Sequence, residues 1–137
     1  MRSTHLELVQ RVINRMASNS FVLKGWSVTL VTALAALGAG LGSWTFPAIS
    51  LLPAISFWAL DAYYLRQERL YRELYDAVRR GQLRDDPFSM DTSNYAPLVH
   101  SLLRTCRSQT VAIFHVAVVA AVIAMILVLL PNAMKGA

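Results

Sequence analysis

The sequence predicts an all-α membrane protein with three transmembrane helices, and three observations support this prediction. Hydrophobic residues make up 55% of the 137 residues, more than the roughly 45–50% of soluble domains. They gather in runs long enough to cross about 30 Å of hydrocarbon as helices. After the second run, a helical period continues to Arg80 with charge on one face. We expect one helical membrane domain, 1–137, with spans at about 21–42, 45–64 and 109–131 and a cytoplasmic helical region at 65–108.

An amphipathic helix is expected before the first span. Thr4 and Glu7 have the spacing of a capping box, in which a hydroxyl and a carboxylate satisfy free amides at a helix start. An apolar stripe at helical spacing follows, formed by Leu6, Val9, Ile13 and Met16. Ser18-Asn19-Ser20 interrupts the pattern, so we expect a bend there. Such a helix lies on a membrane surface or packs against other cytoplasmic helices.

Aromatic residues bound the first span, and glycines end it. Trp26 and Trp44 would lie about 27 Å apart along a helix, which places them at the two membrane surfaces. The charged Lys24 is close enough to the inner end for its ammonium group to reach the interface. Small residues at the outer end permit either a tight turn or the close approach of a second helix. These residues are Gly38, Gly40 and Gly42.

Two prolines mark the second span, which continues as a charged helix. Pro47 falls in the first turn, where its missing amide donor is harmless, and Thr45 can cap the helix. Pro53 removes an amide donor inside the span, so we expect a kink. Beyond the membrane, a stripe of tyrosine and aliphatic residues lies opposite the charges. Gly81 can end the helix through a left-handed cap.

The third span is expected to belong to a second long helix. Pro97 can open this helix, and a long uncharged segment follows. We expect it to run without a break and to end at Pro131. The rods 47–80 and 97–130 would then match in length and pair antiparallel, with the tyrosine stripe of one against the leucine stripe of the other.

The distribution of basic residues predicts the orientation. The chain has 13 Lys and Arg residues against 8 Asp and Glu residues, a formal net charge of +5. Every basic residue except Lys135 is expected on the side of the N-terminus. Positively charged residues near span ends remain in the cytoplasm. We therefore expect a multi-pass protein of the bacterial inner membrane, with a cytoplasmic N-terminus and a periplasmic C-terminus.

Candidate residues for catalysis are lacking. The histidines His5, His100 and His115 are far apart in the sequence, and the single cysteine, Cys106, has no partner at ligand spacing. The sequence has no glycine-rich phosphate loop and no paired catalytic carboxylates. We expect no enzymatic activity, no cofactor, no metal site and no direct binding of duplex nucleic acid.

Polar residues within the spans are candidates for a pore or gate. His115 is expected either as a neutral imidazole bonded to a neighbouring helix or as a proton relay or gate. Asp61 can pair with Lys24 or Arg66 at the inner interface. Hydroxyl groups in spans bond to a backbone carbonyl one turn back or, in an oligomer, line a polar path. The pore or gate candidates are Thr29, Thr32, Ser50, Pro53, Ser56 and His115.

The basic residues allow three interpretations. Attraction to anionic lipids explains those near the membrane surface, which are Lys24, Arg66, Arg104 and Arg107. Ion pairs along a helix explain Arg69, Arg72 and Arg80. Arginines that converge without carboxylate partners would bind a phosphate-rich ligand. The ligand-binding candidates are Arg11, Arg15, Arg79, Arg84, Arg104 and Arg107.

Two stretches, Arg11–Val31 and Phe57–Arg79, resemble a group of small uncharacterised bacterial helical membrane proteins. The overall plan resembles the small membrane effectors of anti-phage defence systems. In those systems a partner nucleotidyltransferase makes a nucleotide signal, and the effector permeabilises the inner membrane. This second resemblance rests on size and layout. It implies a nucleotide ligand.

These features favour an oligomeric inner-membrane effector or channel that permeabilises the membrane when its basic cytoplasmic helices sense a ligand. One copy with three spans is too small to enclose a hydrophilic path, so we expect a homo-oligomer in the lipid bilayer. The alternative is a non-conducting membrane anchor or scaffold for a cytoplasmic partner protein.

Overall fold

The computed structural model describes residues 2–83 and 88–135, and within these ranges it contains helices and no strands. The elements are α1 (Arg2–Leu41), α2 (Thr45–Arg80), the 3-10 helix η1 (Ser93–Leu98), α3 (Leu102–Cys106) and α4 (Gln109–Lys135). Three of these helices are long and apolar enough to cross a membrane. The prediction of an all-α multi-pass membrane protein is confirmed.

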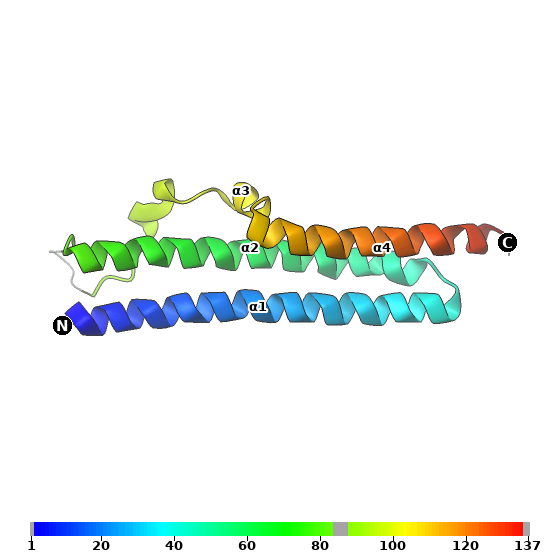
Figure 1. Ribbon diagram of the computed structural model, residues 1–137, viewed down its shortest axis with the longest axis horizontal. Helices are drawn as coiled ribbons and strands as arrows, with labels where there is room; N and C mark the ends of the chain where they lie inside the picture. Colours follow the sequence, from blue (N-terminus) through cyan, green and yellow to red (C-terminus); the bar gives the residue numbers. More distant parts are fainter. Residues whose placement is uncertain (1, 84–87, 136–137) are drawn as a thin grey trace.

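Helices α1 and α2 lie side by side along their whole length, whereas α4 covers only the half near their connection (Figure 1). We call the part where α4 lies on α1 and α2 the apolar half. The polar half contains residues 2–20, 65–83 and 88–107. The long rod formed by α1 spans about 60 Å at 1.5 Å per residue, about twice the hydrocarbon thickness. Half of this rod therefore projects beyond the membrane.

Helix α1 is uninterrupted, which corrects two predictions. No break occurs at Ser18-Asn19-Ser20, and Thr4 already lies inside the helix, so it is not the N-cap. Serine and asparagine cost a helix at most about 0.7 kcal/mol each relative to alanine. Packing against α2 outweighs this cost, and Ser20 itself donates a hydrogen bond to Asp61 of α2.

The polar half has its own hydrophobic core between α1 and α2. Its buried members are Val9, Ile13, Leu74 and Val78, and partly buried residues around them include Leu6, Tyr71, Tyr75, Met90 and Tyr95. The prediction that the tyrosine stripe packs on a helix 97–130 is therefore wrong. Because α1 has no bend, its own apolar stripe reaches the tyrosine stripe and covers it.

The segment before the third span does not form the predicted second rod. Instead of a helix from Pro97, the chain forms η1, an extended Val99 and the short helix α3 before α4 begins at Gln109. A long helix here would find no free apolar face of α2 to pack against, because α1 already covers that face. Packing supplies most of the stability of a helix in a protein. At the other end, α4 continues through Pro131 to Lys135, so the predicted end at Pro131 is also wrong.

The connection between α1 and α2 is a tight turn, one of the two interpretations of the glycines. Gly42 has a φ of +63°, which glycine adopts without strain. Gly38 lies against Pro47 so closely that an added Cβ would be 2.5 Å from the proline Cδ. Gly38 is buried within the chain, against the start of α2.

Helix α2 follows the sequence prediction except at its start. Its N-cap is Trp44, which makes no side-chain capping bond, so the predicted cap at Thr45 is wrong. Pro47 stands in the first turn, as predicted, and the helix continues through Pro53. Gly81 ends it with a φ of +73°, which confirms the left-handed cap. The kink at Pro53 stays a prediction.

Candidate functional site

A cluster of polar side chains joins the three long helices in the apolar half. Asp61 of α2 is fully buried. Its Oδ2 atom lies 2.6 Å from Nζ of Lys24 on α1 and 2.9 Å from Nε2 of His115 on α4. The hydroxyl of Ser20 donates to the other carboxylate oxygen. One carboxylate thus holds α1, α2 and α4 together.

Aromatic rings surround the His115 imidazole. Trp58 stacks on it with ring centroids 5.9 Å apart, and Phe114 contacts it edge-on at 5.0 Å. A carboxylate only accepts hydrogen bonds, so Nε2 of His115 carries the proton that is donated to Asp61. The buried Nδ1 has no partner among the described residues.

The charges within the cluster balance. Lys24 is the partner of Asp61, which confirms one of the two predicted pairs, and its side chain is 24% exposed. Arg66, the other predicted partner, donates instead to the backbone carbonyl of His100 at 3.2 Å. The positive charge of Lys24 opposes the negative charge of Asp61. This balance lowers the cost of burying the carboxylate. His115 is bonded to a neighbouring helix, as the first interpretation of the sequence predicted.

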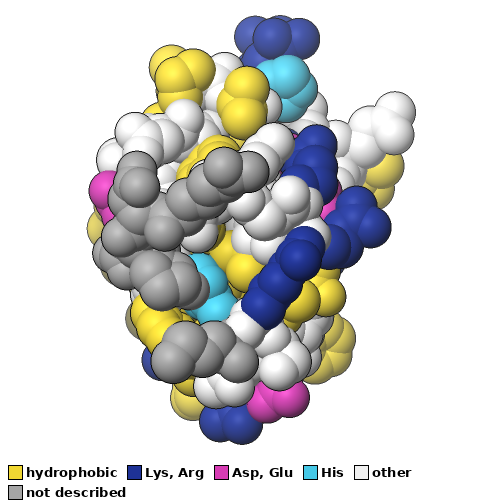
Figure 2. Space-filling model, turned by 90° about the vertical axis from the view of Figure 1, so that its left-hand side faces the viewer, with side chains coloured by type: hydrophobic (Ala, Val, Ile, Leu, Met, Phe, Trp, Pro, Cys, Tyr) yellow, Lys and Arg dark blue, Asp and Glu magenta, His cyan; other side chains and the backbone are white. Residues whose placement is uncertain are grey.

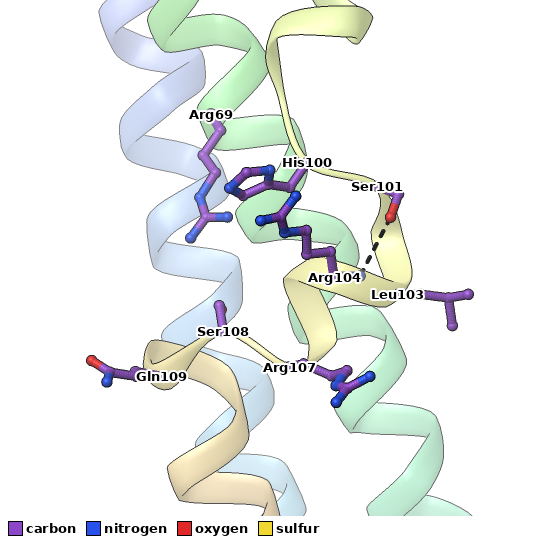
Figure 3. Close-up of a pocket in the computed structure, with 8 residues that line it drawn as sticks. All are labelled: Arg69, His100, Ser101, Leu103, Arg104, Arg107, Ser108 and Gln109. Atoms are coloured by element: carbon purple, nitrogen blue, oxygen red, sulfur yellow. Dashed lines mark hydrogen bonds between the residues drawn. The ribbon is translucent and has the colours of Figure 1, made fainter.

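A basic pocket of about 760 Å³ lies where α4 begins (Figure 3). Its lining comes from α2 and the segment before α4, and includes Arg69, His100, Ser101, Arg104, Arg107 and Gln109. In Figure 3 the guanidinium groups of Arg69 and Arg104 lie near the His100 ring, whereas Arg107 points away from that pair. Within the described ranges none of these arginines forms an ion pair with a carboxylate. Among the described residues, no carboxylate therefore pairs with the arginines of this pocket.

Two hydrogen bonds from α2 hold the segment that carries Arg104. Nε of Arg66 donates to the carbonyl of His100 at 3.2 Å, and Nε1 of Trp58 donates to the carbonyl of Cys106 at 3.1 Å. One bond is on each side of Arg104 in the sequence. Trp58 also stacks on His115, so it connects this segment to the buried cluster.

The structure brings together only part of the predicted ligand site. Arg104 and Arg107 line the pocket, whereas Arg11 and Arg15 are exposed on α1 and do not. Exposed Arg79 lies 3.4 Å from a carboxylate oxygen of Asp76. The remaining candidate, Arg84, lies outside the described residues.

Sequence reasoning missed Arg69 as a pocket residue. Its position on α2 suggested a surface ion pair with Glu73, but no such pair is present between these two described residues. Arg69 faces the segment 99–108 because that segment crosses α2 instead of continuing as a helix. Local periodicity carries no signal for this contact.

The pore candidates do not line a common path within one copy. Thr29, Thr32 and Ser56 are exposed, Pro53 is partly buried, and Ser50 and His115 are buried. The hydroxyls of Ser50 and Thr29 donate to backbone carbonyls one turn back at 2.7 and 2.9 Å. This confirms the backbone-bonding interpretation for these two residues. The exposed hydroxyls remain available to a second copy.

The fold defines the class of the protein, a multi-pass α-helical membrane protein with three span-length helices. Comparisons with protein-family models, curated proteins and solved structures give no match for this chain. In the part of the chain that the structure describes, no three His, Cys, Asp or Glu side chains are placed to hold a metal ion. The buried cluster around Asp61 and the basic pocket are therefore the candidate functional sites.

Proposed function

We propose that this chain is an inner-membrane effector that, as an oligomer, permeabilises the membrane when an anionic, phosphate-bearing ligand binds its basic pocket. The observation that supports this proposal is the group of arginines in the pocket, none of which pairs with a carboxylate among the described residues. Guanidinium groups bind phosphate oxygens through paired N–H donors. The resemblance to anti-phage effectors makes a nucleotide signal a candidate ligand.

The position of the pocket gives ligand binding a route to the spans. Gln109 lines the pocket and is the first residue of α4. His115, less than two turns further along α4, bonds to Asp61. A ligand that draws Arg104 and Arg107 inward moves the start of α4 relative to α2. Because the hydrogen bond between His115 and Asp61 joins α4 to α2, this movement would lengthen or break it.

The proposed orientation places the polar half in the cytoplasm. Viewed from the polar end, many Lys and Arg side chains lie along one side of the molecule (Figure 2). The turn between α1 and α2, at the opposite end, has no Lys or Arg. This asymmetry fits the retention of positive charge on the cytoplasmic side.

Cys106, the single cysteine of the sequence, provides a test of this orientation. A membrane-impermeant maleimide should leave Cys106 unlabelled in spheroplasts and label it after detergent permeabilisation. Burial raises the pKa of the Cys106 thiol, so both reactions are run at mildly alkaline pH, where more thiolate forms. A Thr45→Cys substitution in a Cys106→Ala background should give label in intact spheroplasts. The reverse pattern would invert the topology.

Dye release from reconstituted vesicles tests the proposed activity. Vesicles of phosphatidylethanolamine and phosphatidylglycerol would contain the protein, and a panel of linear and cyclic nucleotides would be added outside and inside. We expect one of them to raise release. Arg104→Gln/Arg107→Gln should weaken this response about tenfold or more, because each lost charge-assisted hydrogen bond is worth about 1.5–3 kcal/mol.

The matched control for this experiment is Arg11→Gln/Arg15→Gln, which removes the same charge from exposed positions outside the pocket. It should respond as the unmodified protein does. An absence of release with every nucleotide would overturn the channel proposal. A stable soluble protein that co-purifies with a non-conducting chain would favour the anchor or scaffold alternative.

A further inference from the structure

An apolar groove continues from the basic pocket into the apolar half. It is a shallow hollow of about 580 Å³ that is open to the outside, and all its lining residues belong to α4: Gln109, Thr110, Ile113, Phe114, Ala117, Val118 and Ala121. Gln109 also lines the basic pocket, so the two hollows are neighbours. The basic pocket and the apolar groove thus meet at the first residue of α4.

The length of the groove matches one membrane leaflet. Its lining residues on α4 extend from Thr110 to Ala121, about 16 Å at 1.5 Å per residue. One leaflet of a bilayer with a core of about 30 Å is about 15 Å deep. An acyl chain with its ester end at Gln109 would therefore lie along the groove through most of the depth of the leaflet.

The charge of the pocket selects the headgroup. Arg69, Arg104 and Arg107 face no ion-pair partner among the described residues, although Glu73 lies with Arg69 along a neighbouring hollow. The exposed side chains of Leu98 and Leu103 border the same region. Basic side chains with exposed leucines beside them suit the level of lipid headgroups.

From this arrangement we propose that the pocket and groove together bind one phospholipid with a net negative headgroup from the adjacent leaflet. Arg69 and Arg104 bind its phosphate, and an acyl chain lies against Phe114 and Ala117. The inference rests on the anion pocket of the proposed function and names a lipid as its occupant. A soluble phosphate compound shares the headgroup chemistry but leaves the groove empty.

Native mass spectrometry of the full chain in detergent, with phosphatidylglycerol or phosphatidylcholine added, tests the proposal. We expect phosphatidylglycerol to remain bound at least about tenfold more than phosphatidylcholine. Arg104→Gln/Arg107→Gln should abolish this preference. Arg11→Gln/Arg15→Gln, with the same loss of charge outside the pocket, should keep it.

The groove is tested separately by filling it. Ala117→Phe should lower phosphatidylglycerol binding about tenfold without removing any charge, because its ring would occupy the space of the acyl chain. The control is Ala120→Phe, since Ala120 is exposed on α4 and does not line the groove. Both variants should elute as the unmodified protein does, which checks that they fold.

Equal lipid binding by Ala117→Phe and Ala120→Phe would overturn the lipid inference, and so would equal retention of the two lipids. Binding of glycerol phosphate or ATP that is unaffected by Ala117→Phe, without selective lipid binding, would assign the pocket to a soluble anion. This outcome would leave the proposed effector function standing. Selective lipid binding without dye release would instead keep the lipid site and remove the channel.

Discussion

Replacing Asp61 with alanine should lower the free energy of unfolding by about 3–5 kcal/mol, the usual cost of breaking a buried ion pair. The carboxylate accepts hydrogen bonds from Lys24, Ser20 and His115 and is fully buried. Its removal leaves an ammonium group and a buried imidazole N–H without their acceptor. The loss should appear as a lower unfolding midpoint in a denaturant titration in detergent, followed by circular dichroism.

Glu68→Ala is the matched control for this experiment. Glu68 is also an acidic residue of α2, and its carboxylate lies 2.7 Å from Arg72, whose side chain is 62% exposed. Exposed pairs contribute at most about 1 kcal/mol, so this variant should unfold close to the unmodified protein. Equal midpoints for Asp61→Ala and Glu68→Ala would show that the cluster does not hold the helices together.

A combined Lys24→Met/Asp61→Leu/His115→Leu variant removes all three polar groups at once. It separates the effect of losing their contacts from the cost of leaving buried polar groups without partners. Replacing a whole buried polar group by apolar side chains is often neutral or stabilising. We therefore expect the triple variant to be more stable than Asp61→Ala. A triple variant less stable than Asp61→Ala would mean that the polar contacts of the cluster stabilise the fold more than apolar side chains in their place.

Gly38→Ala should be the second most damaging substitution, with a loss of about 3 kcal/mol from overpacking. A Cβ at Gly38 would lie 2.5 Å from Cδ and 2.9 Å from Cγ of Pro47, and 2.9 Å from the backbone oxygen of Ser43. The proline ring and the backbone cannot move aside as a flexible side chain would. The turn that sets α2 against α1 would have to open, and the unfolding midpoint in detergent would fall.

Gly40→Ala is the matched control, because an added Cβ there meets nothing within 4 Å. Alanine is favoured over glycine in a helix by about 1 kcal/mol, so this variant should be neutral or slightly stabilised. The oligomeric state is measured on the same samples. If Gly38→Ala altered only the oligomeric state and left unfolding unchanged, the glycines would instead serve the close approach of a helix from a second copy.

Features that depend on neighbouring residues in the sequence were predicted well. The three spans follow from long apolar runs with few charges, and the left-handed end of α2 follows from Gly81. The first turn of α2 accommodates Pro47 as its chemistry requires. These features are local because a span needs only enough apolar length and a cap only the right residue.

The candidate sites were predicted in part. The pairing of Asp61 with Lys24 and the bond of His115 to another helix were each expected, but not that both groups share one carboxylate oxygen. Arg104 and Arg107 were ligand candidates, whereas Arg69 was not. A helical period shows which residues share a face, but it does not show which other segment covers that face.

The sequence by itself determined the class of the molecule: an all-α chain whose three apolar runs cross a membrane and whose charges collect at one end. Hydrophobic length and charge asymmetry act on each segment separately, so no partner needs to be known. Only the tertiary structure decided that α1 runs unbroken and covers the tyrosine stripe of α2. That choice depends on competition between two segments for one apolar face. The segment 99–108, which does not pack on that face, crosses α2 and places Arg104 near Arg69.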